Sequence, residues 1–160
     1  MDITTLNKIV WEEMVYANMR ASYFGDLVRV YQHRDQYIRI AVLVLTSGSM
    51  ATAVLSLDQN VRLILPVLAT AGSLWLLLSQ YSALSRDAGE LSLDWGNIAK
   101  EYERLWNHLD DPDAEASYEE IYENAGKLTK QGAKFPQRGK RLEHWFDHSV
   151  EMLVGRYKTA

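Results

Sequence analysis

Small and hydroxyl-bearing residues recur along one face of a stretch that otherwise carries almost no polar side chain. Gly48, Thr52 and Ser56 follow one another at intervals of four, and Ser49 and Ala53 repeat that interval one residue later. In a helix this spacing collects small side chains into a strip on one face. Two chemical uses remain open: hydroxyls that bond between closely packed helices in lipid, or weakly polar walls of a water-filled path with little ion selectivity.

A second apolar stretch adds further small or hydroxylated residues, so the same two uses apply to both stretches. One oligomer could use such a face for packing in a closed state and for lining a pore after a rotation. The candidate residues for pore lining or helix packing are Thr46, Gly48, Ser49, Thr52, Ala53, Ser56, Thr70 and Ser73.

Two segments without charge must position these residues. Residues 40–57 and 63–85 contain no Asp, Glu, Lys or Arg, and a few residues around Asp58 to Asn60 separate them. Crossing about 30 Å of hydrocarbon takes roughly 20 mostly apolar residues. A core helix of a soluble domain normally keeps a polar face, which neither segment has. We therefore expect transmembrane helices at 38–57 and 63–83, joined by a tight hairpin.

The flanking basic residues predict an orientation. The terminal sides of the hairpin carry Arg29, Arg34, Arg39, Arg86 and Lys100, whereas the hairpin itself has Arg62. Because cytoplasmic flanks are enriched in Lys and Arg, both termini are expected in the cytoplasm.

Apolar or small residues recur at alternating steps of four and three outside both membrane segments. The stripe before the first segment, interrupted at Asp35, contains Val10, Met14, Ala17, Ala21, Phe24, Val28, Tyr31 and Ile38, and the stripe after the second contains Leu84, Ala88, Leu91, Trp95, Ile98, Tyr102, Leu105 and Leu109. We expect one helix from about residue 6 to 57, capped by Thr4 or Thr5, and a second cytosolic helix over 84–110. Heptad stripes of this kind pack against each other, within one chain or also between subunits. The predicted cytosolic seam comprises Phe24, Tyr31, Asp35, Arg86, Leu91, Trp95, Ile98, Tyr102 and Leu105. Asp35 and Arg86 should lie level with each other, so we predict that they form an ion pair.

The C-terminal part, residues 111–160, predicts two short helices. Asp111 followed by Pro112 is a typical helix start, and the helix should run to Gln131. A final amphipathic helix over 142–158 follows, with Leu142, Trp145, Phe146, Val150 and Leu153 on its apolar side. The predicted fold is an all-α membrane protein of one domain, residues 1–160, in which 1–37 form a cytosolic helix before the two-transmembrane hairpin and its cytosolic helical stalk.

A basic run extends from the second half of the first short helix to the start of the last one and has two interpretations. It could contact anionic lipid at the cytoplasmic surface or a phosphorylated or protein partner, but it is first of all a solvated surface. Its members are Lys127, Lys130, Lys134, Arg138, Lys140 and Arg141. His144 and His148 are spaced for sharing a metal ion on a helix, yet no third ligand is evident, so we expect incidental surface histidines.

Several function classes lack support in the 160 residues. The chain has no cysteine, which excludes disulfides, thiolate metal sites and cysteine nucleophiles. Gly132 and Gly139 are too far apart for a phosphate-binding P-loop. No nucleophile elbow or dinucleotide fingerprint is present. We expect no enzymatic activity, no cofactor, no metal and no nucleic-acid partner.

The pattern resembles the SLATT family, the SMODS- and SLOG-associating two-transmembrane effector domains. The likeness covers residues 10 to about 110 and includes "RASYFGDLVRVY" before the first span, "SLWLLLSQYSALSRDA" at the end of the second, and "IAKEYERLWNHL" beyond it. Its motif residues are Tyr23, Phe24 and Arg29, the small residues from Ser47 to Ala51, and Tyr102 with Leu105.

This resemblance implies an effector of the bacterial inner membrane that forms a pore or disrupts the bilayer in an anti-phage conflict system. The trigger would come from a separate nucleotide-sensing or nucleotide-synthesising protein, because the chain has no recognisable sensor of its own. The expected partners are therefore the lipid bilayer, further copies of the chain and that sensor. The alternatives are a non-conducting membrane anchor that displays a helical stalk to a partner, and a soluble scaffold.

Overall fold

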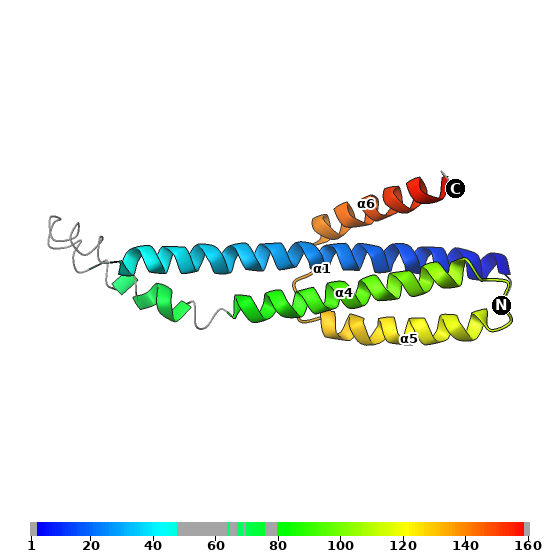
Figure 1. Cartoon of the computed structure of the whole chain (residues 1–160), viewed down its shortest axis with the longest axis horizontal. Coiled ribbons are helices and arrows are strands. Elements are labelled where there is room, and N and C mark those ends of the chain that lie inside the picture. The colour runs from blue at the N-terminus through cyan, green and yellow to red at the C-terminus, as the bar shows by residue number, and fades with distance from the viewer. Residues whose placement is uncertain (1–2, 48–63, 65–66, 69, 76–79, 159–160) are drawn as a thin grey trace. The chain divides into compact units, whose positions relative to one another are not determined.

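The computed structural model describes an all-helical protein over residues 3–47, 64, 67–68, 70–75 and 80–158. Its long elements are α1 (Ile3–Thr46), α4 (Tyr81–Trp106), α5 (Ala114–Gly132) and α6 (Gly139–Lys158), shown in Figure 1. None of the described residues belongs to a β-strand. The all-α class predicted from the sequence is confirmed for this part of the chain.

The contacts divide the chain into two compact units. Met1–Leu27 and Asp87–Ala160 form the first unit, which we call the helical bundle. Val28–Arg86 form the second, which we call the 28–86 unit. Helices α1 and α4 each contribute residues to both units, so the single predicted domain has two separately packed parts.

Contacts within the helical bundle establish how its helices run. Trp106 Nε1 donates a hydrogen bond to Asn7 Oδ1 (2.6 Å), while Ser92 Oγ donates to the Ala21 carbonyl (2.8 Å). Later residues of α1 thus meet earlier residues of α4, and the two helices are antiparallel. Tyr102 of α4 contacts Tyr118 of α5 with ring centroids 6.3 Å apart. These contacts make α4 the neighbour of both α1 and α5.

The predicted heptad stripes form the core of the bundle. Val10, Met14 and Tyr102 are fully buried. The other stripe members in the bundle that are buried are Ala17, Phe24, Ala88, Leu91, Trp95, Ile98 and Leu105. Each large apolar side chain removed from water in this way stabilises the fold by roughly 1.5–3 kcal/mol before the cost of ordering it. The helical period of the sequence therefore predicted the buried faces correctly.

Three predicted helix ends differ from the structure. Thr4 and Thr5 lie inside α1, which already includes Ile3. Helix α4 ends at Trp106 rather than near residue 110. Helix α5 begins at Ala114, two residues later than expected, because Asp111 and Pro112 belong to a turn closed by the Ala114 N–H to Asp111 carbonyl hydrogen bond (3.1 Å).

The last two helices agree with the prediction in number and differ slightly in length. Helix α6 begins at Gly139, three residues before the predicted Leu142. On its apolar side Leu153 is buried, whereas Leu142, Trp145, Phe146 and Val150 are half-buried. Helix α6 is therefore the least deeply packed helix of the bundle.

The described parts of the 28–86 unit show antiparallel contacts. The rings of Tyr31 and Tyr81 stack with centroids 6.1 Å apart. A methyl-sized atom added at Gly72 would lie 3.3 Å from Cγ2 of Val42, so this glycine permits close approach. Later residues of the first arm therefore contact earlier residues of the second arm, as expected for the two arms of a hairpin.

Much of the predicted membrane hairpin falls outside the described residues. This applies to the first predicted span from residue 48 onward, to the turn at Asp58 to Asn60, and to parts of the second span. Across the ranges that the structure does describe, no helix has both the length and the apolar character needed to traverse a bilayer.

Candidate functional site

The predicted hydroxyl strip is described only at its margins. Gly48, Ser49, Thr52, Ala53 and Ser56 lie outside the described residues. Thr46 is the last residue of α1. Thr70 and Ser73 lie in the helical segment 70–75, where Thr70 is exposed and Ser73 is half-buried. The roles assigned to this strip therefore stay predictions.

An apolar surface surrounds those margins. Tyr37 and Leu43 of α1 are each 70 % exposed, and Trp75 is 58 % exposed. The remaining large apolar side chains exposed in this unit are Ile40, Val44, Ile64, Val67, Leu68 and Leu74. Large apolar side chains that are exposed together in one part of a protein mark contact with a protein or a membrane. The 28–86 unit therefore carries a surface suited to an apolar environment.

One predicted ion pair is wrong. Arg39 Nε donates to Asp35 Oδ2 at 2.7 Å, and Arg86 is exposed. The two partners lie four residues apart on α1, where side chains of one helix are neighbours. Asp35 therefore pairs with a residue of its own helix and not with a residue of another helix. Of the predicted seam in this unit, Asp35 is half-buried and Tyr31 is buried.

A polar cluster lies beside the core of the bundle. The Arg20 guanidinium sits 4.7 Å from the Trp95 ring centroid and donates a hydrogen bond to Thr129 Oγ1 (3.0 Å). Burial raises the pKa of Glu13, although the nearby positive charge of Arg20 lowers it in part. Burial also raises the pKa of Tyr102, and the charge of Glu13 adds to this rise. Tyr102 Oη has no hydrogen-bond partner among the described residues.

The predicted basic run does not form one free patch. Lys134 pairs with Asp87 of α4, and Arg141 Nη1 lies 3.1 Å from Asp26 Oδ2 of α1. Lys127 donates to Asn124, while Lys130, Arg138 and Lys140 are exposed. Two of the six charges therefore help to hold the α5–α6 region to the rest of the bundle, which the linear sequence did not reveal.

The α5–α6 connection and α6 itself have further attachments. Tyr23 Oη donates to the Pro136 carbonyl and accepts from the Arg138 N–H. Near the other end of α6, Tyr157 Oη and Arg156 Nη1 both donate to Glu103 Oε1, at 2.7 and 2.8 Å. These hydrogen bonds lower the pKa of Glu103, against a smaller rise from burial.

The predicted histidine pair lies on the exposed surface of α6. The rings of His144 and His148 both contact the ring of Trp145, with centroids 5.2 and 5.6 Å away. Within the described ranges, no cluster of three or more potential ligands is arranged to hold a metal ion. The pair therefore remains without a metal assignment.

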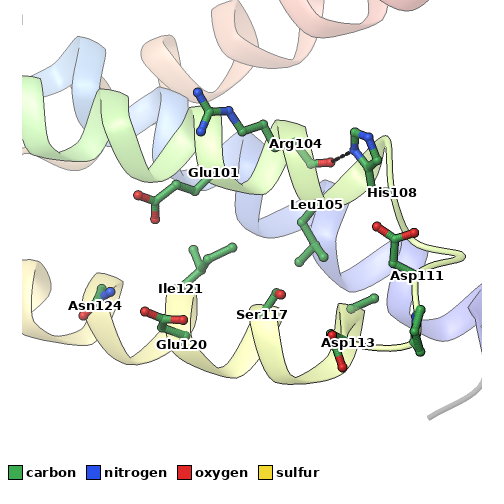
Figure 2. A pocket seen from close by; sticks show the side chains of 12 residues that line it. Glu101, Arg104, Leu105, His108, Asp111, Asp113, Ser117, Glu120, Ile121 and Asn124 are labelled. Atoms are coloured by element: carbon green, nitrogen blue, oxygen red, sulfur yellow. Dashed lines mark hydrogen bonds between the residues drawn. The ribbon is translucent and has the colours of Figure 1, made fainter.

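A groove of about 580 Å³ lies between α4 and α5 of the bundle (Figure 2). We call it the α4–α5 groove. Leu105 and Ile121 point toward each other across it, and Ser117 lies between them (Figure 2). The complete lining is Glu101, Arg104, Leu105, His108, Asp111, Pro112, Asp113, Ala114, Ser117, Glu120, Ile121 and Asn124.

The walls of the α4–α5 groove are predominantly acidic. Glu101, Asp111, Asp113 and Glu120 contribute four carboxyl groups, and none of them forms an ion pair with another described residue. Arg104 extends away from the space between the two helices (Figure 2). No site was predicted from the sequence for the acidic residues of α5. The acidic residues of the turn after α4 could have indicated the groove, because this turn leads α5 back alongside α4.

Comparisons of the chain with protein-family models, with curated proteins and with solved structures found no match.

Proposed function

We propose that this protein is an oligomeric effector of the bacterial inner membrane that forms a pore or disrupts the bilayer in an anti-phage conflict system. In this proposal residues 38–57 and 63–83 of the 28–86 unit span the membrane, and the helical bundle and both termini are cytoplasmic. The strip containing Ser49 and Thr52 lines the conducting path in the open state. A separate nucleotide-sensing or nucleotide-synthesising protein supplies the trigger.

The observation that carries the proposal is the apolar surface of the 28–86 unit, which includes Tyr37, Leu43 and Trp75. Exposing such side chains to water is unfavourable by about 25 cal/mol for each Å² of apolar surface. Placing them in hydrocarbon removes that cost. Small residues support the same placement, since Gly72 permits close helix contact, on which association in lipid depends.

Membrane insertion is tested first and by itself. The full chain, expressed in bacteria, should stay in the membrane pellet after extraction with alkaline carbonate. Recovery in the supernatant would refute the membrane placement and leave a soluble scaffold as the remaining alternative.

Pore formation is tested by release of dye and ions from liposomes that contain the purified full chain. Ser49→Leu should suppress release, because a bulky apolar side chain narrows and dries a weakly polar path. Ser82→Leu is the matched control, since Ser82 is an exposed serine of α4 outside the strip. Equal release from both variants would contradict the assignment of the strip.

A non-conducting membrane anchor is the second candidate, and the α4–α5 groove favours it. A cytosolic bundle with an acidic groove suits a partner that must be held at the membrane. Liposomes that stay tight although the protein is inserted would support the anchor, provided that extract from infected bacteria also fails to open them. Opening by that extract would instead identify a closed effector that lacked its trigger.

A further inference from the structure

The exposed side chains of the 28–86 unit change from polar to apolar along its first arm. Between residues 28 and 36 of α1, every exposed residue is polar: Arg29, Gln32, His33, Arg34 and Gln36. From Tyr37 onward the large exposed apolar side chains of α1 are Tyr37, Ile40, Leu43 and Val44. Arg39 lies beyond this change, but its guanidinium reaches back along the helix to Asp35. The change in polarity thus falls at Tyr37.

The second arm shows the same change in the opposite chain direction. Its large exposed apolar side chains are Ile64, Val67, Leu68, Leu74 and Trp75. Within residues 80–86, every exposed residue is polar: Gln80, Ser82 and Arg86. Among the residues that the structure describes, the exposed apolar part of the second arm therefore ends at Trp75.

The register of the two arms places Tyr37 and Trp75 at nearly the same level. A Cβ added at Gly72 would lie 3.3 Å from Cγ2 of Val42. Tyr37 lies five residues before Val42, and Trp75 lies three residues after Gly72. Because the arms are antiparallel, their levels differ by two residues, which is roughly 3 Å at 1.5 Å per residue. We call Tyr37 and Trp75 the aromatic girdle.

A bilayer surface accounts for this common level, whereas a protein partner does not require it. The boundary between water and hydrocarbon is flat and crosses both arms, so it demands the same change in polarity on each. A protein that packed against one side of the unit would set no such level. Tyr and Trp are also the residues enriched at the interfaces of membranes. The aromatic girdle therefore indicates where the cytoplasmic leaflet begins.

Two arginines on the polar side of the aromatic girdle have no acidic partner. Asp35 is the single acidic residue between residues 28 and 57, and Arg39 pairs with it. Neither Arg29 nor Arg34 forms an ion pair with another described residue. Arg34 lies roughly 4.5 Å along the helix from Tyr37, within the headgroup layer of about 5–7 Å in each leaflet. Arg29 lies roughly 12 Å from Tyr37, just outside that layer.

We infer that the 28–86 unit selects anionic phospholipids of the cytoplasmic leaflet, with Arg34 bound to the lipid phosphate and the aromatic girdle at the border of the hydrocarbon. A guanidinium can donate two parallel hydrogen bonds to one phosphate group. Arg29 adds an attraction to the charged surface, which falls off within a Debye length.

The inference rests on the proposed membrane placement, and it moves the cytoplasmic end of the second span from residue 83 to about Trp75. Asp58 of the predicted turn lies 21 residues after Tyr37 and 17 residues before Trp75 in the sequence. Both separations stay within the roughly 17–25 residues that a membrane span needs.

The test measures the quenching of Trp75 fluorescence by lipids that carry bromine on their acyl chains. Trp75 is the single tryptophan of the 28–86 unit. The purified full chain is reconstituted into bilayers of phosphatidylcholine and phosphatidylglycerol, with bromine on one of the two lipids at a time. The part of the quenching that Trp75→Phe removes is the signal of Trp75. Phosphatidylglycerol should bind beside Trp75 about fivefold more tightly than phosphatidylcholine.

Three arginine variants test which residue makes this selection. R34Q should remove most of the preference for phosphatidylglycerol, and R29Q should remove less, because Arg29 lies farther from the phosphates. The matched control is R104Q, since Arg104 is an exposed arginine of the bundle that forms no ion pair with a described residue. R104Q should leave the preference unchanged. Circular dichroism should confirm that all three variants remain helical.

The possible failures are distinguishable. Absence of Trp75 quenching by brominated phosphatidylcholine would refute the membrane placement together with the lipid selection. Quenching with equal binding of the two lipids would overturn the selection alone, and so would equal losses in R34Q and R104Q. A preference that disappears when phosphate replaces chloride at equal ionic strength would identify a site for free phosphate and overturn the assignment to lipid.

Discussion

The helical bundle and the 28–86 unit treat apolar side chains in opposite ways, although α1 runs through both. In the part of α1 that belongs to the bundle, buried apolar residues recur along the helix from Leu6 to Leu27. Among the described residues of the 28–86 unit, Tyr31 is the single buried hydrophobic residue. That unit instead contains nine of the fourteen large apolar side chains that are exposed in the described chain.

This difference separates two ways of stabilising a helix. The bundle buries its own apolar stripe, so its helices are stabilised by tertiary packing in water. The 28–86 unit leaves an apolar surface for something else to cover. Apolar residues therefore have two outcomes in this chain. They are buried within the bundle where the helix also has a polar face, and they stay exposed in the 28–86 unit where it has none.

The largest expected effect is the loss of a core tyrosine of the bundle. Tyr102 is fully buried, whereas Tyr37 of the 28–86 unit is 70 % exposed. Tyr102→Ala should destabilise the protein by about 3–5 kcal/mol, because it empties a buried site. Tyr37→Ala should change the free energy of unfolding by no more than about 0.5 kcal/mol. Denaturant unfolding in detergent would measure both, and equal losses would contradict the contrast between the two units.

A companion change at the same site sharpens this prediction. Tyr102→Phe removes a buried hydroxyl that has no hydrogen-bond partner among the described residues. It should be neutral or slightly stabilising, because no hydrogen bond is lost. A loss comparable with that of Tyr102→Ala would show that the hydroxyl has an important partner.

A charge placed on each unit tests the contrast directly. Leu43→Arg in the 28–86 unit should reduce membrane retention, because a charged side chain makes the free energy of insertion less favourable by up to about 3 kcal/mol. Leu93→Arg is the matched variant in the bundle, since Leu93 is 72 % exposed and Leu43 is 70 % exposed. It should leave retention unchanged. Carbonate extraction of the two variants measures the effect, and equal retention would refute lipid contact at Leu43.

Two glycines of α5 test how tightly the bundle is packed. A methyl group added at Gly132 would lie 2.9 Å from Cζ of Phe24, whereas one added at Gly126 would have no atom within 4 Å. Gly132→Ala should therefore destabilise the protein by about 1–3 kcal/mol. Gly126→Ala should stabilise the helix by up to about 1 kcal/mol. Thermal unfolding by circular dichroism would show melting temperatures that move in opposite directions.

The smallest effect concerns the attachment of α6. Hydrogen bonds from Tyr157 and Arg156 lower the folded-state pKa of Glu103 below its ordinary value. The resulting stability is present above the ordinary glutamate pKa and is lost as the pH falls through the folded-state pKa. Glu103→Gln should therefore cost about 1 kcal/mol at neutral pH and nothing in strong acid. Unfolding curves at several pH values would detect this, and a loss independent of pH would contradict the charged interaction.

The sequence predicted helices better than it predicted their ends and partners. Helical content and buried faces follow from the spacing of apolar residues, which is a local property. The start of α5 was misplaced by two residues because Asp111 and Pro112 serve a turn as well as they serve a helix start. The Asp35–Arg86 pair was predicted from level positions on two helices, yet Arg39 was nearer along the same helix.

For the described residues, the amino-acid sequence by itself determined that the chain is helical and which faces of α1 and α4 are buried, because a period near 3.6 residues is set within one helix. Tertiary structure alone decided which charges meet between helices. It paired Lys134 and Arg141 with Asp87 and Asp26, and it brought four carboxylates together at the α4–α5 groove. The residues of the two ion pairs are far apart in the chain, so only the packing of whole helices places them together.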